Sequence, residues 1–199
     1  MSMSVIDTLI FDRTAEDVER VKTLKAQIMQ NGLSSLSSAE RAEFMAGMRG
    51  AYNYTDMNRV GNAVAYIAQR MTALPGQLQA YRQAHGVAED SIYDLPYDPS
   101  AVSVTPKTDW SVSDIPTQTQ IRTYLANISN LRSILTLPSG TPSPPANLNG
   151  MTYTIANNLE RILYVIYQRF TEIEAEWYDL IDRATLDHMF TGEVYAGEI

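Results

Sequence analysis

The two most informative stretches of this sequence are AYNYTDMNRVGNAVAYIAQRMTAL at residues 51–74 and GMTYTIANNLERILYVIYQRFTEI at residues 150–173. They align without a gap at an offset of 99 residues (150 − 51). Apolar residues recur in both at three- and four-residue spacing, which is the pattern of an amphipathic helix. The identical pairs are Tyr54/Tyr153, Thr55/Thr154, Asn58/Asn157, Ile67/Ile166, Gln69/Gln168, Arg70/Arg169 and Thr72/Thr171. We therefore predict two long helices that belong to an internal repeat.

Two further helical stretches are predicted, and each of the four follows a threonine that can cap the first turn. The predicted caps are Thr14, Thr55, Thr117 and Thr154, and a shorter helix is predicted after Ser37. The stretches form two tandem helix-pair units, pseudo-repeats 11–86 and 108–186, whose apolar stripes would close a four-helix bundle. The predicted fold is therefore mainly α, with one helical-bundle domain over residues 1–186 and a tail over residues 187–199.

Proline and glycine mark the expected breaks. Pro75-Gly76 is predicted to interrupt the second long helix, although residues 77–84 could resume it before Gly86 ends it. Residues 86–116 lack a helical period, and the alternation in Val102-Ser103-Val104-Thr105 allows a short strand. Residues 137–150 contain four prolines and are predicted to be an extended linker. The tail contains two successive copies of a five-residue pattern: an aromatic residue, a small residue, Gly, Glu and an aliphatic residue. It is predicted to be extended.

Composition excludes several classes of function. The chain of 199 residues has no cysteine, and 15 Lys+Arg against 23 Asp+Glu give a net charge of −8. Disulfides and thiolate chemistry are thereby excluded. Without a basic block, neither nucleic acid nor an anionic membrane is expected as a partner. The N-terminal residues do not resemble a secretory signal, so synthesis and folding in a cytoplasm are expected.

The search for catalytic groups favours a non-enzymatic protein without a cofactor. His85 and His188 are far apart in the sequence and lack metal-ligand spacing, and we expect both to be surface residues. No serine nucleophile elbow or phosphate-binding loop is present. The best enzymatic candidates are Glu172, Glu176 and Asp179, which share a helix face and could bind a hard cation. A solvated acidic face is the favoured interpretation.

The last helix suggests self-association. Beyond Thr171 its apolar stripe narrows to Ile173, Trp177, Leu180 and Ile181, and a narrow stripe needs one partner helix. A second copy of the chain is the predicted partner, and coverage by residues 95–110 of the same chain is the alternative. The hypothetical interface also includes four residues of the tail: Phe190, Val194, Tyr195 and Ile199.

Several short stretches resemble a family of structural proteins from the tail and baseplate regions of phages and prophages of Gram-positive, often gut, bacteria. They are Phe11-Asp12-Arg13-Thr14, the run GAYNYTDMNRV at residues 50–60, Thr108-Asp109-Trp110, Asp114-Ile115-Pro116-Thr117 and the closing FTGEVYAGEI at residues 190–199. The similarity follows the same order over nearly the whole chain. It implies a virion component with no catalytic residues.

These observations together lead to the expectation of a structural protein of the virion, made in the cytoplasm of the host bacterium. It would act as a helical spacer or adaptor that self-associates or docks on other tail proteins. Two alternatives remain open at this point. One is a bacterial cytosolic adaptor that binds proteins, and the less favoured one is a metal-dependent hydrolase that uses Glu172, Glu176 and Asp179.

Overall fold

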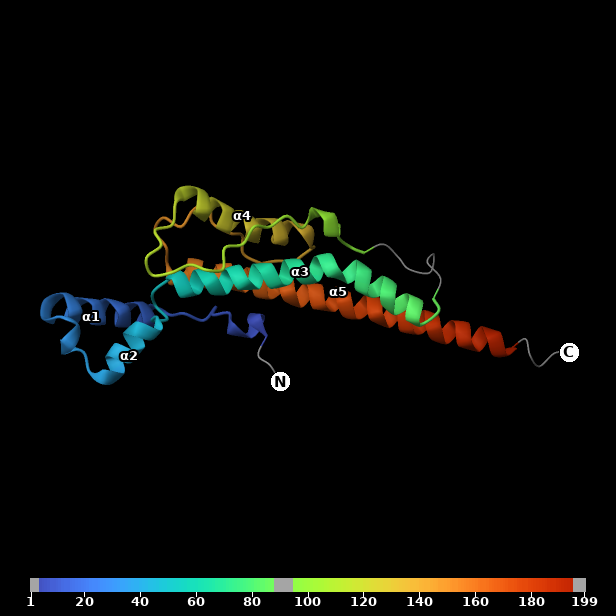
Figure 1. The fold of residues 1–199 in the computed structure, drawn as a ribbon, viewed down its shortest axis with the longest axis horizontal. Coiled ribbons are helices and arrows are strands. Elements are labelled where there is room, and N and C mark those ends of the chain that lie inside the picture. Colours follow the sequence, from blue (N-terminus) through green and yellow to red (C-terminus); the bar gives the residue numbers. More distant parts are fainter. Residues whose placement is uncertain (1–3, 88–94, 195–199) are drawn as a thin grey trace.

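The computed structural model describes the backbone of residues 4–87 and 95–194, with side chains up to Leu186. The described chain is mainly α and contains no strand. Its helices are α1 (Ala15–Asn31), α2 (Ser38–Ala46), α3 (Tyr54–Ala84), α4 (Gln118–Ile134) and α5 (Tyr153–Val194), and short 3-10 turns cover Val5–Thr8, Leu33–Ser35 and Pro99–Ala101. The molecule is elongated, and α3 and α5 run side by side along its length (Figure 1).

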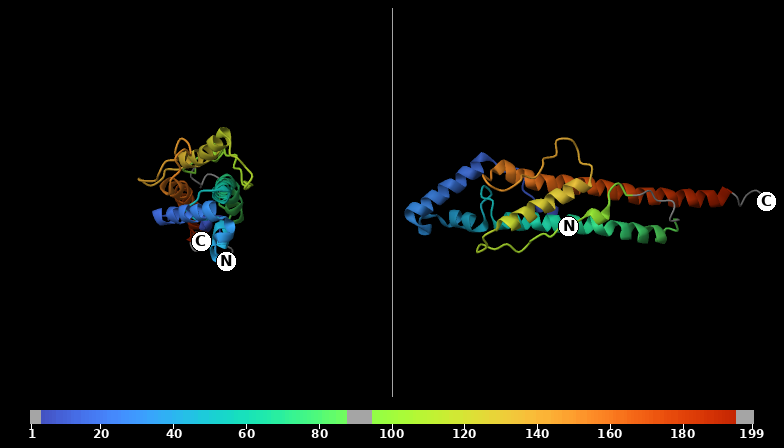
Figure 2. Two further views of the ribbon diagram at one scale, coloured as in Figure 1. Left: turned by 90° about the vertical axis from the view of Figure 1, so that its left-hand side faces the viewer. Right: turned by 90° about the horizontal axis from the view of Figure 1, so that it is seen from above.

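Three helices form the bundle. α4 lies across the pair of α3 and α5, as Figures 1 and 2 show, and each helix contacts the other two. The stripes predicted from the sequence supply the core, because each stripe can leave water only against another. Fully buried residues of this core are Val60, Ile67, Met71 and Leu74 of α3, Ile128 and Leu131 of α4, and Leu159, Leu163, Ile166 and Phe170 of α5.

α1 does not join the bundle, so the predicted four-helix bundle is wrong in this respect. It packs with α2 and the turn between them at one end of the molecule, where Leu24, Leu36 and Met48 form a separate small core (Figure 1). At Gly50 the chain passes so close to the backbone of Asp17 in α1 that a Cβ atom would not fit. The apolar stripe of α1 is therefore covered locally, by residues that directly follow it.

Helix capping is partly as predicted. Thr14, Ser37 and Thr117 each form a capping box, with Asp17, Glu40 and Gln120 respectively. The caps predicted at Thr55 and Thr154 are wrong by two residues. Asn53 caps α3, and the Thr152 hydroxyl accepts the Ile155 N–H at the start of α5. Asn53 and Thr152 are again 99 residues apart (152 − 53), so the internal repeat extends to the caps.

Pro75 does not interrupt α3, contrary to the prediction. Proline removes the N–H that would bind the carbonyl of Met71 one turn earlier. In this structure the buried hydroxyl of Tyr97 donates to that carbonyl at 2.8 Å. The helix therefore continues because a side chain from the following irregular segment replaces the missing donor.

Residues 102–116 are irregular as predicted, and the short strand that the alternation at residues 102–105 allows does not form. Two asparagine side chains of α4 bind this backbone instead: Asn130 Oδ1 accepts the Ser103 N–H and Asn127 Oδ1 accepts the Thr105 N–H, each at 2.9 Å. Since these amides already have acceptors, no second strand is needed. Residues 137–150 contain no helix, which agrees with the predicted linker.

α5 continues to Val194 and passes the end of α3 (Figure 1). The predicted extended tail is therefore wrong for residues 187–194, and residues 195–199 lie outside the described chain. Residues 187–194 contain no proline and one glycine, Gly192. A single glycine costs a helix only about 1 kcal/mol relative to alanine.

Candidate functional site

A buried cluster of four charged side chains lies where the N-terminal segment meets α3 and α5. Arg13 is at its centre, and its side chain is 1% exposed. One guanidinium nitrogen, Nη2, donates to Asp56 at 2.8 Å and to Glu160 at 2.6 Å. The other nitrogens donate to the backbone carbonyls of Ile10 and Arg49. Every nitrogen of the guanidinium group is thus bound within the chain.

Glu160 completes the cluster from the buried face of α5. Its side chain is 0% exposed and accepts from the Ile10 N–H at 2.6 Å, from Arg13, and from Arg59 at 2.8 and 2.9 Å. Arg59 also pairs with Asp56. Two guanidinium groups therefore face two carboxylates, and the formal charges cancel, as buried charges require.

Two tyrosines adjoin this cluster. The hydroxyl groups of Tyr52 and Tyr124 are hydrogen-bonded to each other, and Arg13 lies 5.8 Å from the Tyr52 ring centroid. Burial raises the pKa of both hydroxyls well above the ordinary value. Neither tyrosine supplies a phenolate at neutral pH, so the pair serves as a neutral contact between α4 and the start of α3.

Two asparagines hold extended segments against the helices in the same way. Asn58 of α3 accepts from the Trp110 N–H at 2.7 Å and donates to the Trp110 carbonyl at 2.8 Å. Asn157 of α5 accepts from the Arg13 N–H at 3.0 Å and donates to the Arg13 carbonyl at 2.9 Å. We call these two arrangements the asparagine clamps. Asn58 and Asn157 are an identical pair of the repeat, which accounts for their shared role.

The clamps cross between the two pseudo-repeats. The segment that precedes α1 is held by α5, and the segment that precedes α4 is held by α3. The same relation places Gly61 of α3 opposite Glu160 of α5 in the alignment. A Cβ atom at Gly61 would overlap the carbonyl oxygen of Lys107, so the segment before α4 lies directly on α3. At the equivalent position of α5, the segment before α1 meets the carboxylate of Glu160 instead.

The predicted interface on α5 is covered within the chain. Ile173, Trp177 and Ile181 are buried in the main core, and Leu180 is half-buried. The last turns of α3 cover them: Tyr81 packs edge-on against Tyr178 and donates to Asp182 at 2.8 Å. The stripe is therefore covered without a second copy, and Tyr97 of the alternative segment 95–110 belongs to the same core and lies edge-on against Phe170.

The tail residues of the predicted interface cannot be placed. The backbone of Phe190 and Val194 belongs to α5, but their side chains, and the whole of Tyr195 and Ile199, lie outside the described part of the structure. The side chain of His188 also lies outside it. His85 is exposed just after the end of α3, and its ring packs against that of Tyr81 with centroids 4.1 Å apart and an interplanar angle of 35°.

The acidic residues on α5 do not converge. Glu172 pairs with Arg169 at 3.0 Å, Asp179 pairs with Arg183 at 2.6 Å, and Glu176 is exposed. Across residues 4–87 and 95–186, histidine and acidic side chains form no group of three that could hold a metal ion. The arrangement is that of a solvated helix face with local ion pairs.

The ion cluster could not be found from local sequence. Arg13 and Glu160 are separated by 147 residues, and no helical spacing links them. The available signal is a glutamate at a position where the apolar stripe of α5 predicts a buried residue. Arg13, Asp56 and Arg59 all fall in the stretches that carry the phage-tail resemblance.

Comparisons with known proteins add no relative: no protein-family model, no curated protein and no solved structure matches this chain. Among the described helices, none has a stretch both long and apolar enough to span a lipid bilayer.

Proposed function

We propose that this chain is a non-enzymatic structural protein of a phage or prophage virion, associated with the tail or baseplate. It acts there as a helical spacer or adaptor that binds copies of itself or neighbouring tail proteins. It is made in the cytoplasm of the host bacterium and then enters the particle. Neither nucleic acid nor a membrane is a partner in this proposal.

One observation carries the proposal: the residues of the phage-tail resemblance are used to hold the chain together. Arg13, Asp56 and Arg59 are occupied by the ion cluster, and Asn58 holds Trp110. A catalytic group needs a free reactive atom within reach of a substrate. These side chains are bound to their own chain, which is what a scaffold requires.

The distribution of exposed apolar side chains supports a role as a spacer. Met29 and Met45 are 77% and 70% exposed in the α1–α2 unit at one end of the long axis. Leu186 is 53% exposed on α5 toward the opposite end (Figure 1). Exposed apolar residues toward both ends of an elongated molecule suit contacts with neighbours on either side.

Particle composition tests the proposed location. Prophage particles would be induced in the source bacterium, purified by density gradient and digested for peptide mass spectrometry. We expect peptides of this chain to co-sediment with tail proteins in a constant ratio. Recovery only from the soluble lysate, with none in the particles, would contradict the proposal and favour a cytosolic adaptor.

Light scattering tests the proposed self-association. The full chain would be compared with a truncation after Leu186, which leaves the described core intact. We expect the truncation to lower the average mass or weaken its dependence on concentration, because the removed segment holds Phe190, Val194, Tyr195 and Ile199 of the hypothetical interface. Identical monomers in both samples would argue against self-association through this end.

A further inference from the structure

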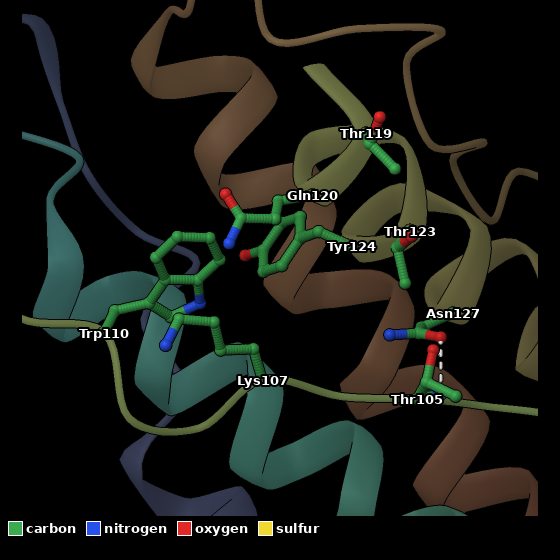
Figure 3. A pocket seen from close by; sticks show the side chains of 8 residues that line it. All are labelled: Thr105, Lys107, Trp110, Thr119, Gln120, Thr123, Tyr124 and Asn127. Carbon is green, nitrogen blue, oxygen red and sulfur yellow. Dashed lines mark hydrogen bonds between the residues drawn. The ribbon is translucent and has the colours of Figure 1, made fainter. Parts of the chain in front are cut away.

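A small pocket lies between α4 and the extended segment that crosses α3. Its volume is about 160 Å³. One wall is the segment, with Thr105, Lys107 and Trp110; the other wall is α4, with Thr119, Gln120, Thr123, Tyr124 and Asn127 (Figure 3). A cavity of about 150 Å³ is large enough for a benzene-sized molecule.

Trp110 has a polar atom that no described residue satisfies. The residue is 4% exposed, and its indole Nε1–H is buried without a hydrogen-bond partner in the described structure. The indole nitrogen faces the open centre of the pocket (Figure 3). A buried donor without an acceptor is costly, and native proteins rarely keep one. An acceptor supplied from outside the chain would remove this cost.

The other polar groups of the pocket also offer donors. Gln120 uses Oε1 to accept from Thr117, which leaves its amide N–H groups for the pocket. Asn127 uses Oδ1 to accept from Thr105, and its amide nitrogen faces the centre from the side opposite Trp110 (Figure 3). Tryptophan can only donate, and both amide oxygens are occupied. The pocket is therefore matched to a ligand that accepts hydrogen bonds.

The charges around the pocket favour a neutral acceptor. Lys107 is the cation of the lining, and its Nζ is bound to Asp109 at 2.5 Å with Asp114 at 3.8 Å. Two carboxylates thus face one ammonium group, and the chain as a whole carries a net charge of −8. An anion would be opposed by these charges, whereas the carbonyl oxygen of an amide would not.

We infer that this pocket binds a small, largely apolar group through a neutral carbonyl oxygen, which accepts from Trp110 Nε1 and from the amide of Gln120, while Asn127 lines the opposite wall. The group is an amide, either in a free molecule or in a side chain of a neighbouring protein. This inference does not depend on the proposed function, because it rests only on the lining of the pocket.

The indole N–H resonances give a direct test. The chain has two tryptophans, so ¹H–¹⁵N spectra of the labelled full chain contain two indole signals, and Trp110→Phe identifies one of them. We expect 2-pyrrolidinone to shift the Trp110 signal to saturation and to leave the Trp177 signal in place. An absent or non-saturating shift would overturn the inference and leave a site that holds only water.

Ligands of similar size distinguish a neutral from an anionic acceptor, and a free molecule from a protein side chain. Butyrate has a similar size but is an anion, and binding at least as tight as that of the lactam would overturn the assignment of a neutral acceptor. N-acetylglutamine amide carries the same carbonyl on a side chain. Saturation by the lactam alone supports a free small molecule, and saturation by the capped glutamine as well supports a side chain of a partner.

Variants of α4 complete the test. Gln120→Glu keeps an oxygen that caps the helix but removes the N–H donors, and we expect it to weaken lactam binding about tenfold, the effect of one lost hydrogen bond. Thr123→Leu fills the pocket and should abolish binding. Ser129→Leu makes a similar change at an exposed position of the same helix and should leave binding unchanged. Equal affinity in all three variants would overturn the inference.

Discussion

Glu160 lies on the buried face of α5, where leucine or isoleucine would continue the apolar stripe. The carboxylate is tolerated there because it accepts from two arginines and one backbone N–H. Such a cluster is costly to desolvate and adds little net stability over apolar packing. Its contribution is orientation, since it fixes the N-terminal segment relative to both long helices.

We predict that Glu160→Gln destabilises the fold by about 3–5 kcal/mol, because Arg13 and Arg59 then share a single carboxylate inside the protein. Urea denaturation monitored by circular dichroism gives the free energy of unfolding. Glu172→Gln, an exposed change on the same helix, serves as the control and should cost about 1 kcal/mol or less. Similar losses in the two variants would show that the cluster is not coupled to folding.

Tyr97 offers a second test at a single atom. We predict that Tyr97→Phe costs about 1–3 kcal/mol, because the carbonyl of Met71 loses its donor while it stays buried. Pro75→Ala restores a helical N–H that can donate to this carbonyl. In that background Tyr97→Phe should cost clearly less, which a double-mutant cycle measures. An unchanged cost would mean that ring packing, and not the hydrogen bond, dominates.

At the level of elements, equivalent residues of the repeat predicted from the sequence also have the same structural role. Asn58 and Asn157 were recognised only as an identical pair, and both hold the backbone of an extended segment against a helix. The halves differ beside these clamps. One half fills the space with charged side chains, and the other uses Gly61 to bring backbone against backbone.

We predict opposite effects for two glycine substitutions in α3. Gly76 has open space around it, so Gly76→Ala should stabilise the helix by up to about 1 kcal/mol. Gly61→Ala introduces a Cβ atom that overlaps the Lys107 carbonyl and should destabilise the fold by about 1–3 kcal/mol. Thermal unfolding of both variants checks this, and stabilisation by Gly61→Ala would contradict the close approach.

Local pattern predicted the helices well, because three of the capping boxes and every long apolar stripe lie within short windows of sequence. It failed where a distant residue decides the outcome. Pro75 was expected to break α3 because nothing near it in sequence reveals the hydroxyl of Tyr97. The stripe from Ile173 to Ile181 was expected to be covered by a second copy or by residues 95–110, because the pattern of one helix does not reveal which part of the chain lies against it.

At the scale of the whole molecule, buried tyrosines make stability depend on alkaline pH. Burial raises the pKa of Tyr97 from 10.0 to about 12, and the pKa values of Tyr52 and Tyr124 are raised as well. Below the pKa of tyrosine in the unfolded chain, these groups are protonated in both states and do not make stability depend on pH. At higher pH the unfolded chain releases protons that the folded chain retains. The free energy of unfolding should therefore fall as pH rises above about 10.

The measurement is a series of urea denaturation curves between neutral and alkaline pH. We expect Tyr97→Phe, although less stable at neutral pH, to lose stability less steeply than the parent between about pH 10 and 12, because one of the raised groups is gone. Tyr153→Phe is a suitable control because Tyr153 is 38% exposed. Parallel curves for the parent and Tyr97→Phe would contradict the assignment.

The buried ion cluster also has a consequence for biosynthesis. Arg13 leaves the ribosome long before Glu160, its partner 147 residues later. At about 5–20 residues per second, the nascent N-terminus waits roughly 7–30 s for the helix that will receive it. A stalled or prematurely terminated polypeptide therefore cannot bury this arginine, and only a translated sequence that reaches α5 can close the structure.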